Sequence, residues 1–267
     1  MTDKQTREIL EQIKAHDRRR VAMMKIVAAN ERRVESYVRG LFGWNPTMGK
    51  DHPLVKQAAA AIKAALNEGE ADGLGPQDVD LILATKDSAK PFERGRKDAE
   101  KAMESLVKKL PFWPWVESVR GLGALSAATI IAETGLGNNG QGIAAFSPRS
   151  LRQRLGAAPD EAYPESDKGI RMIPRHRRAR VSTIVGMLLR NNDGGYREIY
   201  DRERAKTYAG YDEKSRKISA VTGKPQLTAH DDLKARRKAT AALLNDFWAA
   251  WTGGEIRGSS TPPQAAE

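Results

Sequence analysis

A helical repeat of apolar residues between residues 3 and 39 constrains the fold of this chain more than any other feature. Apolar side chains recur there at intervals of three, four and seven residues, which places them on one face of an α-helix. The positions are Leu10, Ile13, Met24, Val27, Val34 and Val38. Polar Asp17, Arg20 and Glu31 interrupt this face, so the pattern indicates a partial coiled coil. Thr2 and Gln5 have the spacing of a capping box at its start.

Helical signals continue through residues 1–110. Asp51 is placed to cap a second, alanine-rich helix. Pro76 and Pro91 each predict a helix start, because proline suits the first turn, and the last of these helices runs to Leu110. We therefore expect residues 1–110 to form a helical, partly coiled-coil region suited to self-association.

The segment Pro111-Phe112-Trp113-Pro114-Trp115 ends this region, because two prolines forbid a continuing helix. We place a domain boundary there and predict a second domain over 111–252, followed by a disordered tail over 253–267. Ser147 and Pro148 have the residue types of a helix cap and first turn, and Gly156 ends that helix. Further helices are expected at 177–191, 193–208 and 228–251, with a loop or short hairpin at 160–176 and a loop at 209–226. The predicted fold class is mostly α.

Composition narrows the function. The chain has 267 residues, a net charge of +11 and a pI near 9.8, an excess that favours a polyanionic partner such as nucleic acid. Without cysteine it has no disulfide, thiol nucleophile or cysteine-ligated metal. No apolar stretch approaches the roughly 18 residues of a membrane span, and the polar N-terminus does not read as a secretory signal. We expect a cytoplasmic protein with no membrane partner.

The stretch VRGLGALSAATIIAETG, residues 119–135, predicts a tight Gly-x-Gly turn leading into a slim helix. This is the layout of a helix-hairpin-helix, in which a helix N-terminus offers its N–H groups to a phosphate. The predicted DNA-binding residues of the turn are Arg120, Gly121, Leu122, Gly123 and Ala124. The alternative is an ordinary helix–helix corner, where glycine is also common.

A dense arginine run follows in the sequence RMIPRHRRARVS. Its cations are Arg171, Arg175, Arg177, Arg178 and Arg180. Because the guanidinium fork matches phosphate oxygens, we predict a phosphate-binding ridge. The alternative is a solvated charge run. A further basic group, Lys234, Arg236, Arg237 and Lys238, is expected on the outer face of the last helix.

Several aromatic residues and the histidines are candidates for base stacking, catalysis or metal binding. For each of them the sequence favours a structural role. Trp113 and Trp115 are expected to pack at the domain junction, in preference to stacking on bases. Tyr196 and Tyr200 are one helical turn apart, and packing is favoured over a nucleophilic role. The scattered histidines predict no metal site.

From the turn onward, residues 112–251 resemble the C-terminal domain of insertion-sequence transposases of the 110/116/902 family. The turn is followed by FSPRSLRQRLGAAP, by the basic run and its helix, and by GGYREIYDRERAKTY, in the order that the family shows. The resemblance implies DNA binding in transposition or recombination, as in a mobile element or phage.

Two departures leave catalysis unassigned. The family's RuvC-like domain carries acidic metal ligands on strands, and residues 1–110 show no apolar strand with a central aspartate. Where the family has a nucleophilic serine, this chain has Ile173-Pro174, and neither Ser166 nor Ser182 matches that position. No catalytic residue and no cofactor is predicted, and Mg²⁺ would enter only if a partner supplied the site. Three alternatives stay open: a working transposase, a non-catalytic DNA-binding relative, and a protein that binds RNA or assembles with protein.

Overall fold

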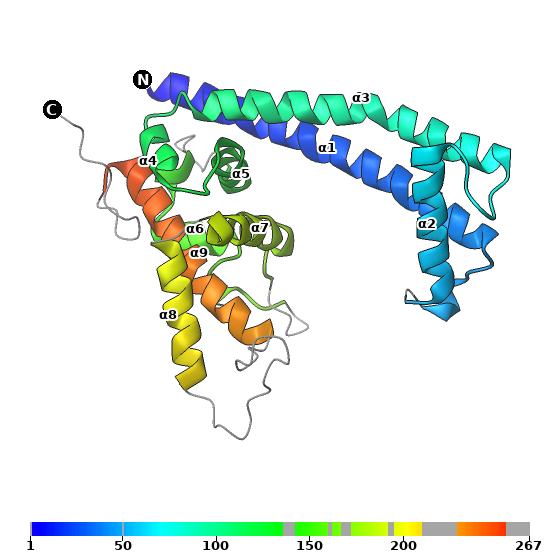
Figure 1. Ribbon diagram of the computed structural model, residues 1–267. Helices are drawn as coiled ribbons and strands as arrows, with labels where there is room; N and C mark the ends of the chain where they lie inside the picture. The colour runs from blue at the N-terminus through cyan, green and yellow to red at the C-terminus, as the bar shows by residue number, and fades with distance from the viewer. Residues whose placement is uncertain are drawn as a thin grey trace. The chain divides into compact units, whose positions relative to one another are not determined.

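The structure, a computed structural model, describes residues 2–49, 51–135, 142–159, 162–166, 172–191, 195–209 and 229–254. Within these ranges the chain is helical and forms no strand, so the predicted mostly α class is confirmed (Figure 1). Two compact units are present: Met1–Ala15 together with Met103–Glu267, called unit 1, and His16–Ala102, called unit 2. The predicted boundary between residues 110 and 111 lies inside unit 1.

The helices have the following bounds. They are α1 Asp3–Leu41, α2 Pro53–Glu68, α3 Pro76–Val107, α4 Trp113–Ser118, α5 Ala124–Thr134, α6 Pro148–Arg154, α7 Arg175–Asn191, α8 Tyr196–Ala209 and α9 Ala229–Thr252. The predicted loop over 209–226 and the predicted tail lie almost entirely outside the described residues.

In unit 2, α1 and α3 run antiparallel. Tyr37 near the end of α1 donates a 2.7 Å hydrogen bond to Asp78 at the start of α3, while Arg20 lies 3.8 Å from Glu100 near the other end. Arg20 also pairs with the buried Asp17 at 2.9 Å. Two of the polar residues that interrupt the apolar face of α1, Asp17 and Arg20, are thus matched by ion pairs. The apolar core of the unit is formed by Val38, Ala58, Ala65, Val79 and Ile82.

Two predicted helix starts in unit 2 are wrong. Pro91 lies inside α3, which continues without interruption where we expected two helices. The missing N–H costs a hydrogen bond, but buried Ala89, Gly95 and Ala99 lie on both sides of the proline. Packing of α3 therefore outweighs the local preference of proline. Asp51 does not cap α2, because the preceding turn places His52 there, and its Nδ1 accepts from the N–H of Leu54.

Other helix ends follow the sequence. Thr2 and Gln5 form the predicted capping box, with reciprocal bonds of 2.9 and 3.3 Å. Ser147 caps α6 by accepting from the N–H of Ser150, and Pro148 occupies the first turn. Gly156 follows the end of α6 with a φ of +74°.

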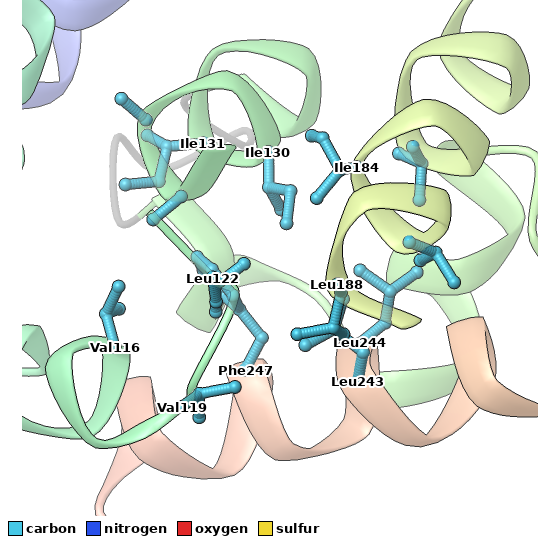
Figure 2. Packing of buried hydrophobic residues seen from close by; sticks show 14 of the residues in the cluster. Val116, Val119, Leu122, Ile130, Ile131, Ile184, Leu188, Leu243, Leu244 and Phe247 are labelled. Atoms are coloured by element: carbon cyan, nitrogen blue, oxygen red, sulfur yellow. The ribbon is translucent and has the colours of Figure 1, made fainter. Parts of the chain in front are cut away.

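Unit 1 is built around α9, which packs against α6, α7 and α8. Its core joins apolar residues from α4, α5, α7 and α9 (Figure 2). Phe247 is central, with ring centroids 5.1 Å from Phe112 and 5.6 Å from Trp115. Leu10 and Ile13 of α1 are buried in the same core. Trp115 is buried there, as a packing role predicts, and Trp113 is half-buried.

Candidate nucleic-acid interface

The turn between α4 and α5 places its two glycines in different environments. Gly121 has a φ of +90°, a conformation in which a side chain is strained. A β-carbon there would lie 3.0 Å from Asn191 Cβ and 3.2 Å from the Leu188 carbonyl oxygen. Gly121 is therefore required by the close approach of the turn to the C-terminal end of α7. Leu122 is buried and lies in the core beside Leu188 and Phe247 (Figure 2).

Gly123 is exposed and is the N-cap of α5, with an extended backbone and no side-chain cap. A β-carbon added there would meet nothing within 4 Å. The first N–H groups of a helix have no partner within the helix and carry its positive dipole end. Ala124 is half-buried in the first turn of α5, and Arg120, in the turn before it, is exposed. The predicted turn thus has one glycine for packing and one that leaves the helix end open.

The arginine run does not form a row of solvated side chains. Arg175 is exposed, but Arg177, Arg178 and Arg180 are only partly exposed and turn toward other parts of unit 1. Arg178 donates to the carbonyl of Gly156 and lies over the ring of Tyr163. Arg171 lies outside the described residues.

A buried carboxylate organises these cations. Glu133, near the end of α5, has a side chain only 8% exposed and accepts a hydrogen bond from Arg180. Its other oxygen lies 3.4 Å from Arg177 Nε and 3.4 Å from His176 Nε2. Since burial of an unpaired carboxylate is costly, at least one of these arginines has a structural role.

Arg154 of α6 joins the group, although the sequence analysis did not select it. Its side chain donates to the carbonyl of Thr134, at the end of α5, and its own carbonyl accepts from Arg177. Burial, and then repulsion from Arg177, lower the pKa of the Arg154 guanidinium. We call Arg154, Arg175, Arg177, Arg178 and Arg180 the arginine cluster. Within this cluster, Arg177 and Arg180 pair with Glu133.

The turn and the arginine cluster lie at opposite ends of one helix pair. Glu133 at the end of α5 meets Arg180 in the first half of α7, whereas Gly121 before α5 meets Asn191 at the end of α7. The two helices are therefore antiparallel. With 11 residues, at about 1.5 Å per residue α5 spans roughly 16 Å. Arg190, exposed in the last turn of α7, precedes the residue that Gly121 approaches and was also not selected from sequence.

The tyrosines have structural partners. Tyr196 is buried and donates a 2.9 Å hydrogen bond to buried Asp246. Tyr200 donates to Asp232. Burial, with the neighbouring carboxylate, raises the pKa of both phenols, which makes them poorer nucleophiles at neutral pH.

The structure describes three residues near the position where the transposase family has its serine: Pro174, Ser182 and Ser166. Pro174 immediately precedes α7, and Ser182 lies in the second turn of that helix, half-buried. Ser166 is half-buried, before residues that the structure does not describe. In the described part of the chain, no three His, Asp or Glu side chains gather as a metal site would require.

Comparison with protein-family models, curated proteins and solved structures finds no match to this chain. Among the described residues, no helix has both the length and the apolar character needed to span a bilayer.

Proposed function

We propose that this chain binds duplex DNA through its sugar–phosphate backbone. The observation that carries the proposal is the arginine cluster, five arginines of α6 and α7 of which Arg177 and Arg180 pair with the buried Glu133. Guanidinium groups bind phosphate oxygens through paired N–H donors, so phosphates are the anions best suited to such a cluster.

Electrostatic repulsion within the cluster supports this assignment. The lowered pKa of Arg154 means that its positive charge is disfavoured by burial and by Arg177. A phosphate bound between these side chains would relieve that repulsion. Such binding releases counterions from DNA, and affinity then falls steeply as salt increases.

The geometry favours contact with the backbone over base reading. Glu133 and backbone carbonyls hold the arginines close to the surface of unit 1. Side chains held in this way suit contact with phosphates at that surface better than contact with base edges inside a groove. The open end of α5 would supply a second phosphate contact roughly 16 Å away along the helix. That separation corresponds to about five base steps at 3.4 Å each.

The proposed role is DNA binding, without a chemical step, in transposition or recombination. Its biological setting is supported by the resemblance of residues 112–251 to the insertion-sequence transposases. The charges and contacts of unit 1 support DNA binding independently of that resemblance.

Fluorescence anisotropy of labelled duplex DNA at several salt concentrations tests the proposal. We expect the logarithm of affinity to fall linearly with the logarithm of salt concentration, and each of Arg175→Gln and Arg120→Gln to flatten that slope by about one ion. Arg202→Gln, at an exposed arginine of α8, is the matched control and should bind as wild type does. Salt-independent binding, or the same loss in the control, would overturn the proposal. So would stronger competition by duplex RNA than by duplex DNA of the same length.

A further inference from the structure

A pocket of about 150 Å³ lies in unit 1, between the end of α6, the first half of α7 and the first half of α9. Its walls come mainly from aliphatic side chains. Among the described residues these are Leu155, Ala157, Val181 and Leu233. Leu233 is 47% exposed, although its neighbours on the surface of α9, Lys234 and Arg237, are cations. The pocket is therefore an apolar site within a basic surface.

Most polar groups around this pocket already have partners within the chain. Arg178 donates to the carbonyl of Gly156, and Arg236 lies 2.7 Å from Asp232. Thr240 donates to the backbone carbonyl of Arg236 at 2.7 Å. A charged group that entered the pocket would exchange its water for aliphatic side chains, which is unfavourable. The pocket thus suits an uncharged ligand.

Ser182 can give such a ligand one polar contact. It lines the pocket from α7 and is half-buried, and its hydroxyl can donate or accept a hydrogen bond. A ligand with apolar faces and polar atoms at its edge would use the aliphatic walls and this hydroxyl together. A nucleobase has that character, because its faces stack on other groups while its edge carries donors and acceptors.

The volume of the pocket admits one ring system. A space of about 150 Å³ is comparable to an engineered apolar cavity that holds a benzene ring. Such a space suits a single base and excludes the sugar and phosphate of its nucleotide. Those groups would remain outside the pocket.

Exposed arginines flank the pocket on two helices. Arg237 lines it from α9, and Arg175 lies on α7 one helical turn before Arg178, on the same face. A strand whose base entered the pocket would keep its neighbouring phosphates at the surface, where cations of this kind suit them. Arg178 belongs both to the pocket lining and to the arginine cluster, so the two sites adjoin.

We propose that this pocket binds an unpaired nucleobase turned out of a DNA strand. The choice of DNA as its source rests on the proposed function, whereas the choice of a flat, uncharged ring rests on the volume and lining of the pocket. A base that is already unpaired costs least to turn out of its stack. The chain therefore prefers duplexes that contain an unpaired base over fully paired ones.

The first experiment compares three duplexes by anisotropy at one salt concentration. One carries a single bulged thymine, one carries an abasic residue at the bulge, and one is fully paired. The thymine and abasic duplexes have the same charge and the same bulge, so their difference isolates the base. We expect wild type to bind the thymine duplex about tenfold more tightly than the abasic one, as one stacked base would give.

Three variants locate the base. Ser182→Leu fills the pocket and should lower the affinity for the thymine duplex to that for the abasic one. Thr183→Leu is the matched control, because Thr183 is exposed on α7 and does not line the pocket, so the preference should stay. Leu233→Asn removes part of the apolar wall at an exposed position and should reduce the preference about threefold. It replaces Ser182→Leu if that variant does not fold.

The second experiment uses permanganate, which oxidises thymines that are not stacked. Wild type should protect the bulged thymine, and Ser182→Leu should not. Equal affinity for the thymine and abasic duplexes would overturn the base site and leave the proposed function intact. A preference that survives Ser182→Leu, or that Thr183→Leu also removes, would overturn the assignment to this pocket. Failure to bind any duplex would overturn the proposed function and this inference together.

Discussion

The open N-terminus of α5 allows one substitution to move stability and DNA affinity in opposite directions. Gly123 is an N-cap without a capping side chain, in an extended conformation that any residue can adopt, and a β-carbon there meets no atom. Gly123→Asp would place a carboxylate at this end. Replacing a glycine cap gains a few tenths of a kcal/mol, and a negative charge at the helix start adds about 0.3–1 kcal/mol. The free energy of unfolding should therefore rise by roughly 0.5–1.5 kcal/mol.

The same carboxylate would occupy the place proposed for a phosphate. Two unit charges 4 Å apart in water repel by about 1 kcal/mol, which weakens affinity roughly fivefold. The loss of one phosphate contact should also flatten the dependence of affinity on salt by about one ion.

Urea unfolding measures the stability of the variant, and anisotropy with duplex DNA measures its affinity. Gly123→Ser is the matched control, because it supplies a cap without a charge and should weaken binding much less than Gly123→Asp does. A more stable Gly123→Asp protein that binds DNA with unchanged affinity and salt dependence would refute the contact at α5. A less stable one would refute the assignment of Gly123 as an open N-cap.

Four other substitutions test the packing and the charges of unit 1. Gly121→Ala should lower the free energy of unfolding by about 2–4 kcal/mol, because its positive φ and its approach to α7 exclude a β-carbon. Gly123→Ala, in contrast, should lower the free energy of unfolding by under about 1 kcal/mol. Equal losses for the two variants in urea unfolding would contradict the packing role of Gly121. Glu133→Gln should tighten duplex binding about fivefold at low salt and steepen its salt dependence, since the cations lose their paired charge; an unchanged slope in anisotropy would place DNA elsewhere. Tyr196→Phe should cost about 1–3 kcal/mol by leaving Asp246 without one donor. Because burial raises the pKa of Tyr196, wild-type stability should fall as pH rises above about 10, where the unfolded tyrosine ionises and the folded one does not. Urea unfolding from pH 8 to 11 should show a shallower fall in Tyr196→Phe, and identical curves would contradict the shift.

Several helix starts followed from local signals in the sequence. The capping box of Thr2 and Gln5 and the Ser147-Pro148 start depend on residues within one turn, so their chemistry can be seen in the sequence. Pro91 was misjudged because its local preference is overruled by packing of α3 against α1, which a local pattern does not contain.

The candidate site was harder to predict from the sequence, because the residues that contact one another there are far apart along the chain. The run around Arg177 was visible as charge, but its direction depends on Glu133 and on carbonyls of α6. Arg154 gave no signal, since a lone arginine in a short helix is unremarkable until folding brings it beside Arg177. Gly121 was selected for phosphate binding, whereas the structure gives it a packing role beside α7.

The composition of unit 1 also affects the order in which the chain can fold during synthesis. Residues 1–15 are made before every other part of that unit, yet Leu10 and Ile13 are buried in a core that includes Phe247. Unit 2 is a single continuous segment and can close as soon as its residues have left the ribosome. The apolar face at the start of α1 must instead wait for α9, so Leu10 and Ile13 lack their core partners while translation continues.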